Sequence, residues 1–144
     1  MSFNYPTPTC KVRGFTLMEL MITVAIVALL TTVAYASYKS SVQRAHRTEA
    51  KSALLDIAGR EERLYSTTNT YSNDPKDVGY SGTAGQPFTV GNGYYTVTIS
   101  NVTGTTFKLE ADAQGSQTDD TQCLKFTVDQ TGAEDATDPV CWQK

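Results

Sequence analysis

A single carboxylate at the edge of a long apolar segment is the group in this sequence best placed to do chemistry. Glu19 is followed at once by nineteen residues without a charge, Leu20 to Tyr38. A bare carboxylate in hydrocarbon costs roughly 2.5–3.5 kcal/mol on insertion scales. We therefore expect the chain to use the charge of Glu19; in the alternative interpretation, the side chain only extends to the membrane surface.

Gly14, which lies between Arg13 and Phe15, is suited to a protease site. A residue without a side chain lets another backbone approach closely. An ordinary flexible glycine is the alternative, but the position directly before the apolar segment favours processing.

Other residue types give no support for an enzyme. The sequence has one histidine, His46, and no nucleophile–base pair, phosphate-binding loop, dinucleotide fingerprint or zinc-ligand spacing. Acidic residues gather near the C-terminus without the ordered spacing of a calcium-binding loop: Asp119, Asp120, Asp129, Glu134, Asp135 and Asp138. We predict a non-enzymatic protein with no catalytic residue, metal site or cofactor.

A basic cluster follows the apolar segment and consists of Arg44, His46, Arg47 and Lys51. We expect these side chains to meet lipid headgroups or acidic neighbours. DNA binding is the alternative, but no aromatic residues interleave with the cluster, and the formal net charge is −3. Nucleic acid is therefore not an expected partner.

A long helix has to position these residues. Residues 20–38 can span a hydrocarbon core of ~30 Å, and basic residues before them place the head outside the cytoplasm. Hydroxyl groups in this run can bond to carbonyls of the preceding turn: Thr23, Thr31, Thr32 and Ser37. Residues 39–66 continue as an amphipathic helix with the apolar stripe Ala50, Ala53, Leu54, Ile57, Ala58, Leu64 and Tyr65.

Beyond the helix, the sequence predicts a small sheet. Residues 67–87, rich in glycine and proline, form a connecting loop. Three segments with alternating apolar residues, 94–99, 107–112 and 124–129, are predicted to be antiparallel strands, and the remaining residues a C-terminal loop. The predicted fold class is α+β: a long N-terminal α-helix packed on an antiparallel sheet of three to four strands.

The junction resembles the type IV prepilin family, whose leader ends in Gly before Phe-Thr-Leu-x-Glu. The matching residues are Gly14, Phe15, Thr16, Leu17 and Glu19. The resemblance implies a leader of residues 1–14, cut between Gly14 and Phe15 by prepilin peptidase, and N-methylation of the new N-terminal Phe15. It also implies a pilin fold, with a membrane or filament-core half (15–38), an amphipathic half (39–66) and a globular head (67–144).

The resemblance also implies that Glu19 meets the N-terminal amine of a neighbouring subunit during assembly. Pairing Glu19 with the amine of Phe15 would offset the cost of each charge and favour one axial register. The implied partners are other pilin subunits, prepilin peptidase, the inner-membrane assembly platform and, before assembly, membrane lipid. The implied location is the inner membrane with a periplasmic head, and later the cell-surface pilus.

Two features of the sequence modify this picture. Ala28 and Ala36 stand where many pilins carry Gly and Pro, so we expect this helical segment to resist melting in the filament. Of three cysteines, Cys10 would leave with the leader. Cys123 and Cys141 then remain as an even pair in a head that faces an oxidising compartment, which favours a disulfide over two free buried thiols.

The resemblance implies a structural minor pilin that supports pilus biogenesis, twitching motility and adhesion. The short head, the arginine-rich stretch at 44–51 and the late Cys141-Trp142 are most like the PilE-type minor pilins. Two alternatives stay open: a pseudopilin of type II secretion, and a competence pilin with a DNA-binding head.

Overall fold

The structure of the protein is a computed structural model that describes residues 14–143. The predicted leader, except for Gly14, lies outside the described residues. The chain divides into two compact units, the first ending at Tyr38 and the second beginning at Lys39. Helix α1 (Leu17–Thr68) contributes residues to both units, and it ends two residues beyond the predicted amphipathic segment 39–66.

In the first unit, α1 exposes its apolar side chains. Its most apolar window has a mean hydropathy of 2.2 with no residue buried, so length and composition allow it to cross a membrane. The expected back-bonding of hydroxyl groups is confirmed for three threonines. Thr23 donates to the carbonyl of Leu20 at 2.8 Å, Thr31 to that of Val27 at 2.7 Å and Thr32 to that of Leu29 at 2.8 Å. These bonds remove polar hydrogens from an apolar surface.

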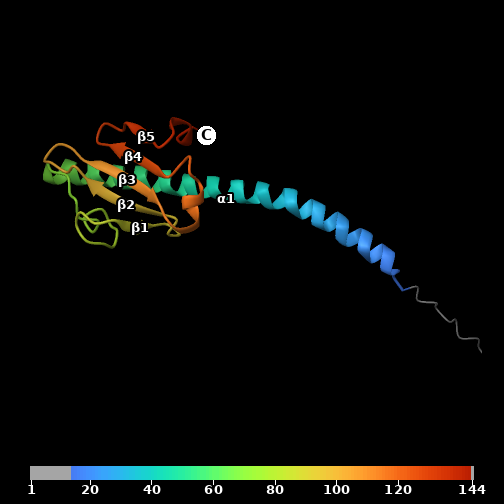
Figure 1. Cartoon of the computed structure of the whole chain (residues 1–144). Helices are drawn as coiled ribbons and strands as arrows, with labels where there is room; N and C mark the ends of the chain where they lie inside the picture. Colours follow the sequence, from blue (N-terminus) through green and yellow to red (C-terminus); the bar gives the residue numbers. More distant parts are fainter. Residues whose placement is uncertain (1–13, 144) are drawn as a thin grey trace, which may run out of the picture. The chain divides into compact units, whose positions relative to one another are not determined.

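The second unit contains a sheet that packs on residues 39–68 of α1 (Figure 1). Its five strands are β1 (Phe88–Val90), β2 (Tyr95–Ser100), β3 (Lys108–Ala113), β4 (Lys125–Asp129) and β5 (Glu134–Ala136). They pair in chain order, and every pair is antiparallel. Two short 3-10 helices, η1 (Gly115–Asp119) and η2 (Pro139–Cys141), follow β3 and β5.

The alternating patterns correctly predicted β2, β3 and β4, but the prediction of three to four strands was wrong because β1 and β5 complete a five-stranded sheet. Both missed strands have only three residues. The sequence of β5, Glu-Asp-Ala, lacks apolar alternation. Its backbone pairs with β4, with Ala136 opposite Phe126, so part of the expected C-terminal loop belongs to the sheet.

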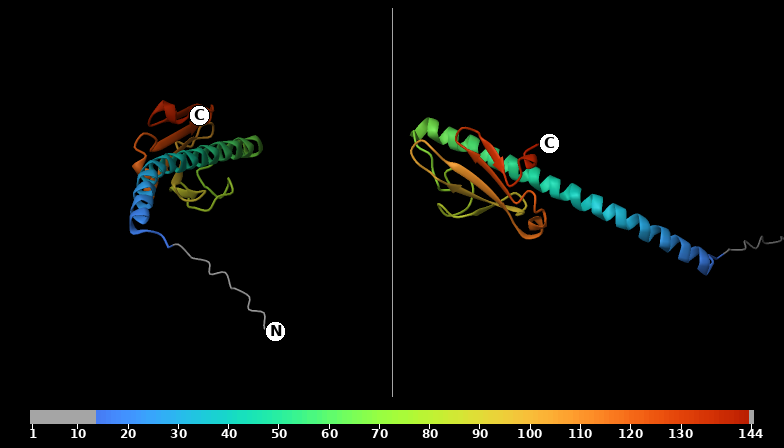
Figure 2. Two further views of the ribbon diagram at one scale, coloured as in Figure 1. Left: turned by 90° about the vertical axis from the view of Figure 1, so that its right-hand side faces the viewer. Right: turned by 45° about the horizontal axis from the view of Figure 1, so that its top comes forward.

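The core lies between α1 and one face of the sheet. Ala50, Leu54 and Ile57 of α1 are at most 1% exposed. Opposite them lie the inward side chains of the three central strands, Val97, Ile99, Leu109, Ala111, Phe126 and Val128. Two further views show the strands beside this helical segment (Figure 2). This layer fixes which side chains of α1 face the head and which face outward.

Candidate functional site

The start of α1 brings the predicted processing and assembly residues together. Gly14, Phe15 and Thr16 precede the helix in extended or irregular backbone, and all three are exposed. The Gly14–Phe15 bond therefore lies outside helical hydrogen bonding. These two residues line one open hollow with Thr16 and Glu19.

Thr16 caps the helix, a role that the sequence analysis missed. Its hydroxyl oxygen accepts a hydrogen bond from the backbone N–H of Glu19 at 3.2 Å. The spacing Thr-x-x-Glu at the start of an apolar run is the signal that predicts such a capping arrangement. The negative charge of Glu19 in the first turn also suits the positive end of the helix dipole. Among residues 14–143, Glu19 has no ion-pair partner, so its charge remains available to another molecule.

A buried ion pair fastens α1 to the segment after β3. Arg47 donates from Nε and Nη2 to the two carboxylate oxygens of Asp120, both at 2.6 Å. The two side chains are 22% and 5% exposed. The hydrogen bond to Asp120 raises the pKa of Arg47 above its ordinary value, and burial opposes this rise.

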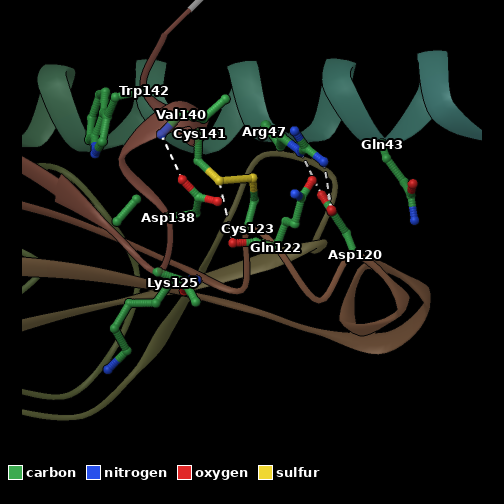
Figure 3. Close-up of a disulfide and its surroundings, with 12 residues drawn as sticks. Gln43, Arg47, Asp120, Gln122, Cys123, Lys125, Asp138, Val140, Cys141 and Trp142 are labelled. Atoms are coloured by element: carbon green, nitrogen blue, oxygen red, sulfur yellow. Dashed lines mark hydrogen bonds and ion pairs between the residues drawn. A yellow bond between two sulfur atoms is a disulfide. The ribbon is translucent and has the colours of Figure 1, made fainter.

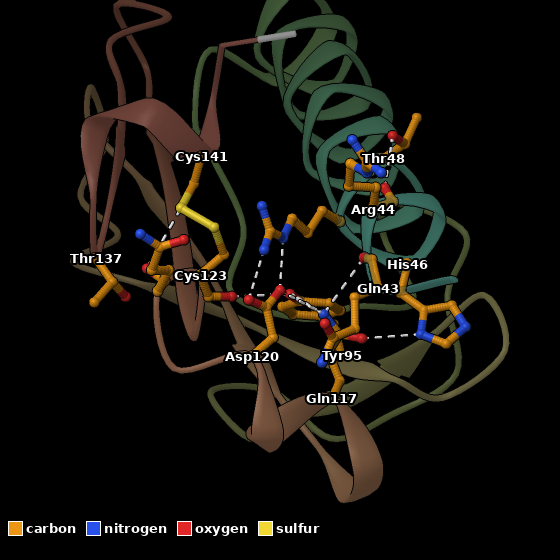
Figure 4. A network of polar contacts seen from close by, with 12 residues as sticks. Gln43, Arg44, His46, Thr48, Tyr95, Gln117, Asp120, Cys123, Thr137 and Cys141 are labelled. Carbon is orange, nitrogen blue, oxygen red and sulfur yellow. Dashed lines mark hydrogen bonds and ion pairs between the residues drawn. A yellow bond between two sulfur atoms is a disulfide. The ribbon is translucent and has the colours of Figure 1, made fainter. Parts of the chain in front are cut away.

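Gln117 of η1 connects that ion pair to its surroundings (Figure 4). Its amide nitrogen donates to Asp120 Oδ2 at 3.0 Å and to the hydroxyl of Tyr95 at 3.3 Å, and its oxygen lies 2.9 Å from Nδ1 of His46. The Tyr95 hydroxyl donates to the carbonyl of Cys123 at 2.9 Å, and burial raises the pKa of this phenol. The His46 ring stacks on Tyr94 with centroids 3.5 Å apart. His46 is therefore part of a structural network.

Three side chains of the basic cluster contact residues of the head. Besides Arg47 and His46, Lys51 lies over the rings of Phe126 and Trp142, at 6.0 and 5.8 Å from their centroids. Arg44 is exposed and points away from this network. The acidic neighbour expected for this cluster lies in the same chain.

A disulfide joins Cys123 to Cys141 with the two Cα atoms 5.7 Å apart (Figure 3). It connects the segment before β4 to η2 and lies close to the Arg47–Asp120 pair. Trp142 follows it, and its ring packs edge-on against Phe126 at 5.6 Å between centroids. The C-terminal segment is therefore held both covalently and by aromatic packing.

An open basic cleft lies at the end of α1, and the sequence analysis did not predict it. Arg60 and Arg63 from α1 and Lys76 from the connecting loop line it, together with Leu64, Thr67, Asp77, Val78 and Gly79. Arg60 donates from Nε to Asp56 at 2.9 Å and from Nη1 to the Val78 carbonyl at 3.2 Å. Among the described residues, neither Arg63 nor Lys76 has an ion-pair partner. The cleft can therefore accept an anionic group.

Comparison with known proteins gives consistent matches. A family model described as "Type IV minor pilin ComP, DNA uptake sequence receptor" matches residues 36–127, and one described as "Prokaryotic N-terminal methylation motif" matches residues 10–35. The type IV major pilin protein PilA of Myxococcus xanthus is 32% identical over 76 residues, 53% of this chain and 34% of that protein. The fimbrial protein EcpC of Eikenella corrodens is 32% identical over 71 residues, 49% of this chain and 46% of that protein.

The matched region thus spans between about a third and a half of these relatives' length. A solved type IV pilin from Shewanella oneidensis has a TM-score of 0.50 at 23% identity, covering 71% of this chain and 99% of that chain. That likeness supports the fold, a long helix packed on an antiparallel sheet. With the first family model covering most of the chain, the sequence resemblance is confirmed: the chain belongs to the type IV pilin family.

Proposed function

We propose that the chain is a minor subunit of a type IV pilus that supports pilus biogenesis, twitching motility and adhesion. The observation that carries this proposal is the exposed apolar half of α1, with a carboxylate at its start, Glu19, that has no ion-pair partner among residues 14–143. Contiguous apolar surface of this size needs a lipid or protein partner. Lipid supplies it before assembly, while the subunit is in the inner membrane, and the helices of neighbouring subunits supply it in the filament.

Processing would precede assembly. Prepilin peptidase would cut between Gly14 and Phe15, where the backbone is exposed and outside the helix. The amine of Phe15 would then be methylated. Mass spectrometry of the chain from cells with an active prepilin peptidase tests this step. We expect a mature chain that begins at methylated Phe15; a chain that still begins at Met1 would refute it.

During assembly at the inner-membrane platform, Glu19 would pair with the amine of Phe15 on a neighbouring subunit. We expect Glu19→Gln to be cleaved normally but to enter sheared surface filaments less than the wild type. Thr16→Val is the matched control, because it removes the cap and leaves the charge. Equal incorporation of wild type and Glu19→Gln would contradict the pairing. Wild-type chain confined to the envelope, with none in sheared filaments, would favour the pseudopilin alternative.

A second candidate function is DNA capture by the head. The matching family model is described as a DNA uptake sequence receptor, and the basic cleft offers Arg63 and Lys76 to an anion. Cations that contact phosphates contribute affinity that falls steeply with salt. The negative net charge of the whole chain argues against broad, nonspecific binding, so any site would be local.

Fluorescence anisotropy with labelled duplex DNA and the full-length chain in detergent tests this function. We expect Arg63→Ala and Lys76→Ala each to weaken binding and to lower the salt slope by about one. Lys125→Ala is the charge-matched control, since Lys125 lies on β4 within ion-pair distance of Glu110 and Asp112. Absence of binding at low salt would exclude the function, and equal effects of all three variants would exclude this cleft.

A further inference from the structure

A carboxylate is buried in the core stripe of α1. The fully buried residues of this helix are Ala50, Leu54, Ile57 and Glu61, at spacings of four, three and four. Glu61 therefore occupies a position that the helical pattern reserves for an apolar side chain. It is 0% exposed. Burial at such a position disfavours a charged carboxylate strongly unless a partner compensates it.

The surroundings of Glu61 offer almost no compensation. Its Oε2 accepts one hydrogen bond, from the backbone N–H of Ser72 at 3.1 Å. Its Oε1 has no hydrogen-bond partner among the described residues. Burial raises the pKa of Glu61, the hydrogen bond from Ser72 opposes this rise, and the charges of Asp77 on the connecting loop and Glu62 on α1 add to it. Burial is the largest of these causes.

The neighbouring cation does not neutralise Glu61. The guanidinium of Arg60 bonds to the carboxylate of Asp56 and to the carbonyl of Val78. Glu62, in turn, accepts a hydrogen bond from the hydroxyl of Tyr71 at 2.8 Å. Phe107, which packs near this end of the helix against Tyr71, carries no charge. The site therefore favours the protonated, uncharged form of Glu61.

Ser72 links Glu61 to the wall of the basic cleft. Its hydroxyl donates to Oδ2 of Asp77 at 2.5 Å and accepts from the backbone N–H of Asp74 at 3.0 Å. Asp77 and Lys76 line the cleft. A charge on Glu61 would repel Asp77 and, because the site is buried, would favour an open loop in which water reaches the carboxylate. The position of Lys76 would then change together with the charge state of Glu61.

We propose that Glu61 is a pH-sensitive latch: its uncharged carboxyl group holds residues 71–79 against α1, and loss of its proton loosens this loop. The linkage has a definite sign. A carboxyl group whose pKa is raised by folding contributes stability below its unfolded pKa and loses it as pH rises through the folded pKa. Since the ordinary pKa is 4.5, the loop should be tight in acid and loosen above that value. This proposal does not depend on what occupies the cleft or on the pilus that the chain serves.

Nuclear magnetic resonance of the full-length chain in detergent, from about pH 4 to 8, tests the latch. We expect the Glu61 side-chain carbon to titrate above 4.5. Exchange of the Ser72 amide, corrected for its intrinsic pH dependence, should rise in the same titration. In Glu61→Gln, a neutral isostere, Ser72 should stay protected throughout. Glu49→Gln, the matched control on α1 whose carboxylate bonds to Asn92 and not to this loop, should keep the wild-type transition.

Three results would overturn the latch: a Glu61 titration at or below the ordinary value, a titration without change at Ser72, or wild-type pH dependence in Glu61→Gln.

Discussion

Breaking the Arg47–Asp120 pair should be among the most damaging single changes in the head. Two charge-assisted hydrogen bonds of 2.6 Å join the side chains, and the Asp120 side chain is only 5% exposed. Arg47→Met keeps much of the side-chain volume and removes the charge. Asp120 would then keep one side-chain donor, Gln117 Nε2 at 3.0 Å. Removing one partner of a buried pair costs about 3–5 kcal/mol, a large share of the ~5–15 kcal/mol typical of a folded domain.

The neighbouring residue provides a matched control. Asp119 pairs with Lys39 at 2.9 Å, but the side chains of Lys39 and Asp119 are 48% and 59% exposed. Solvent screens such a pair, so Asp119→Asn should change the free energy of unfolding by less than about 1 kcal/mol. The double variant Arg47→Met/Asp120→Asn removes both buried charges. It should be less destabilised than the sum of its single variants, because no charge is left unpaired.

Trp142 reports on these variants, since it is the one tryptophan of the chain and packs against Phe126 near the disulfide. Urea unfolding of the full-length chain in detergent, followed by its fluorescence, gives the free energy differences. If Arg47→Met and Asp119→Asn were equally mild, the Arg47–Asp120 pair would not be desolvated, and the reasoning from burial would fail.

Three further predictions use the same unfolding assay. Replacing both Cys123 and Cys141 by Ser should lower the free energy of unfolding by about 3 kcal/mol, the value expected for a bridge between residues 18 apart in the sequence. Reductant should then lower the stability of the wild type and leave that of the variant unchanged. Gly91→Ala should lower the free energy of unfolding by about 1–2 kcal/mol, since Gly91 has φ +52° and a Cβ there would collide with the side chain of Glu49. Gly104→Ala is the control and should be nearly neutral, because a Cβ at Gly104 meets no other atom. Gly59→Ala should stabilise by about 1 kcal/mol, because a Cβ within α1 meets nothing there; a loss of stability would contradict this account.

The parts of the fold that follow from periodicity were predictable from the sequence. Strands β2, β3 and β4 were found because their inward side chains alternate with polar ones, and the extent of α1 followed from its apolar run and stripe. β5 was missed because backbone pairing with β4 holds it, with little apolar burial of its own. The basic cleft was missed because Lys76 comes from a loop whose path only tertiary contacts determine.

Glu61 illustrates a different limit of sequence reasoning. The apolar stripe of α1 has a gap between Ala58 and Leu64, and helical spacing places Glu61 in that gap. A charged residue is ordinarily assigned to the solvent face, so the gap alone does not indicate a buried carboxyl group. The structure shows that Glu61 is buried because the connecting loop covers this turn of the helix, with the backbone N–H of Ser72 bonded to the Glu61 carboxylate.

One group of polar contacts between α1 and the rest of the second unit lies close to Lys39. Gln43, His46 and Arg47 bond to Gln117 and Asp120, within a few residues of the point where the second unit begins. In the proposed filament, the apolar half of α1 exchanges lipid for neighbouring helices while the head keeps its own fold. The head has to stay folded during this exchange, and this network is one of the features that keep it folded. A desolvated ion pair and a nearby disulfide resist strain better than exposed contacts, because opening them exposes a buried charge or requires breaking a covalent bond. The same reasoning predicts that Arg47→Met, even where the subunit still folds, will reduce its recovery in sheared filaments more than Asp119→Asn does.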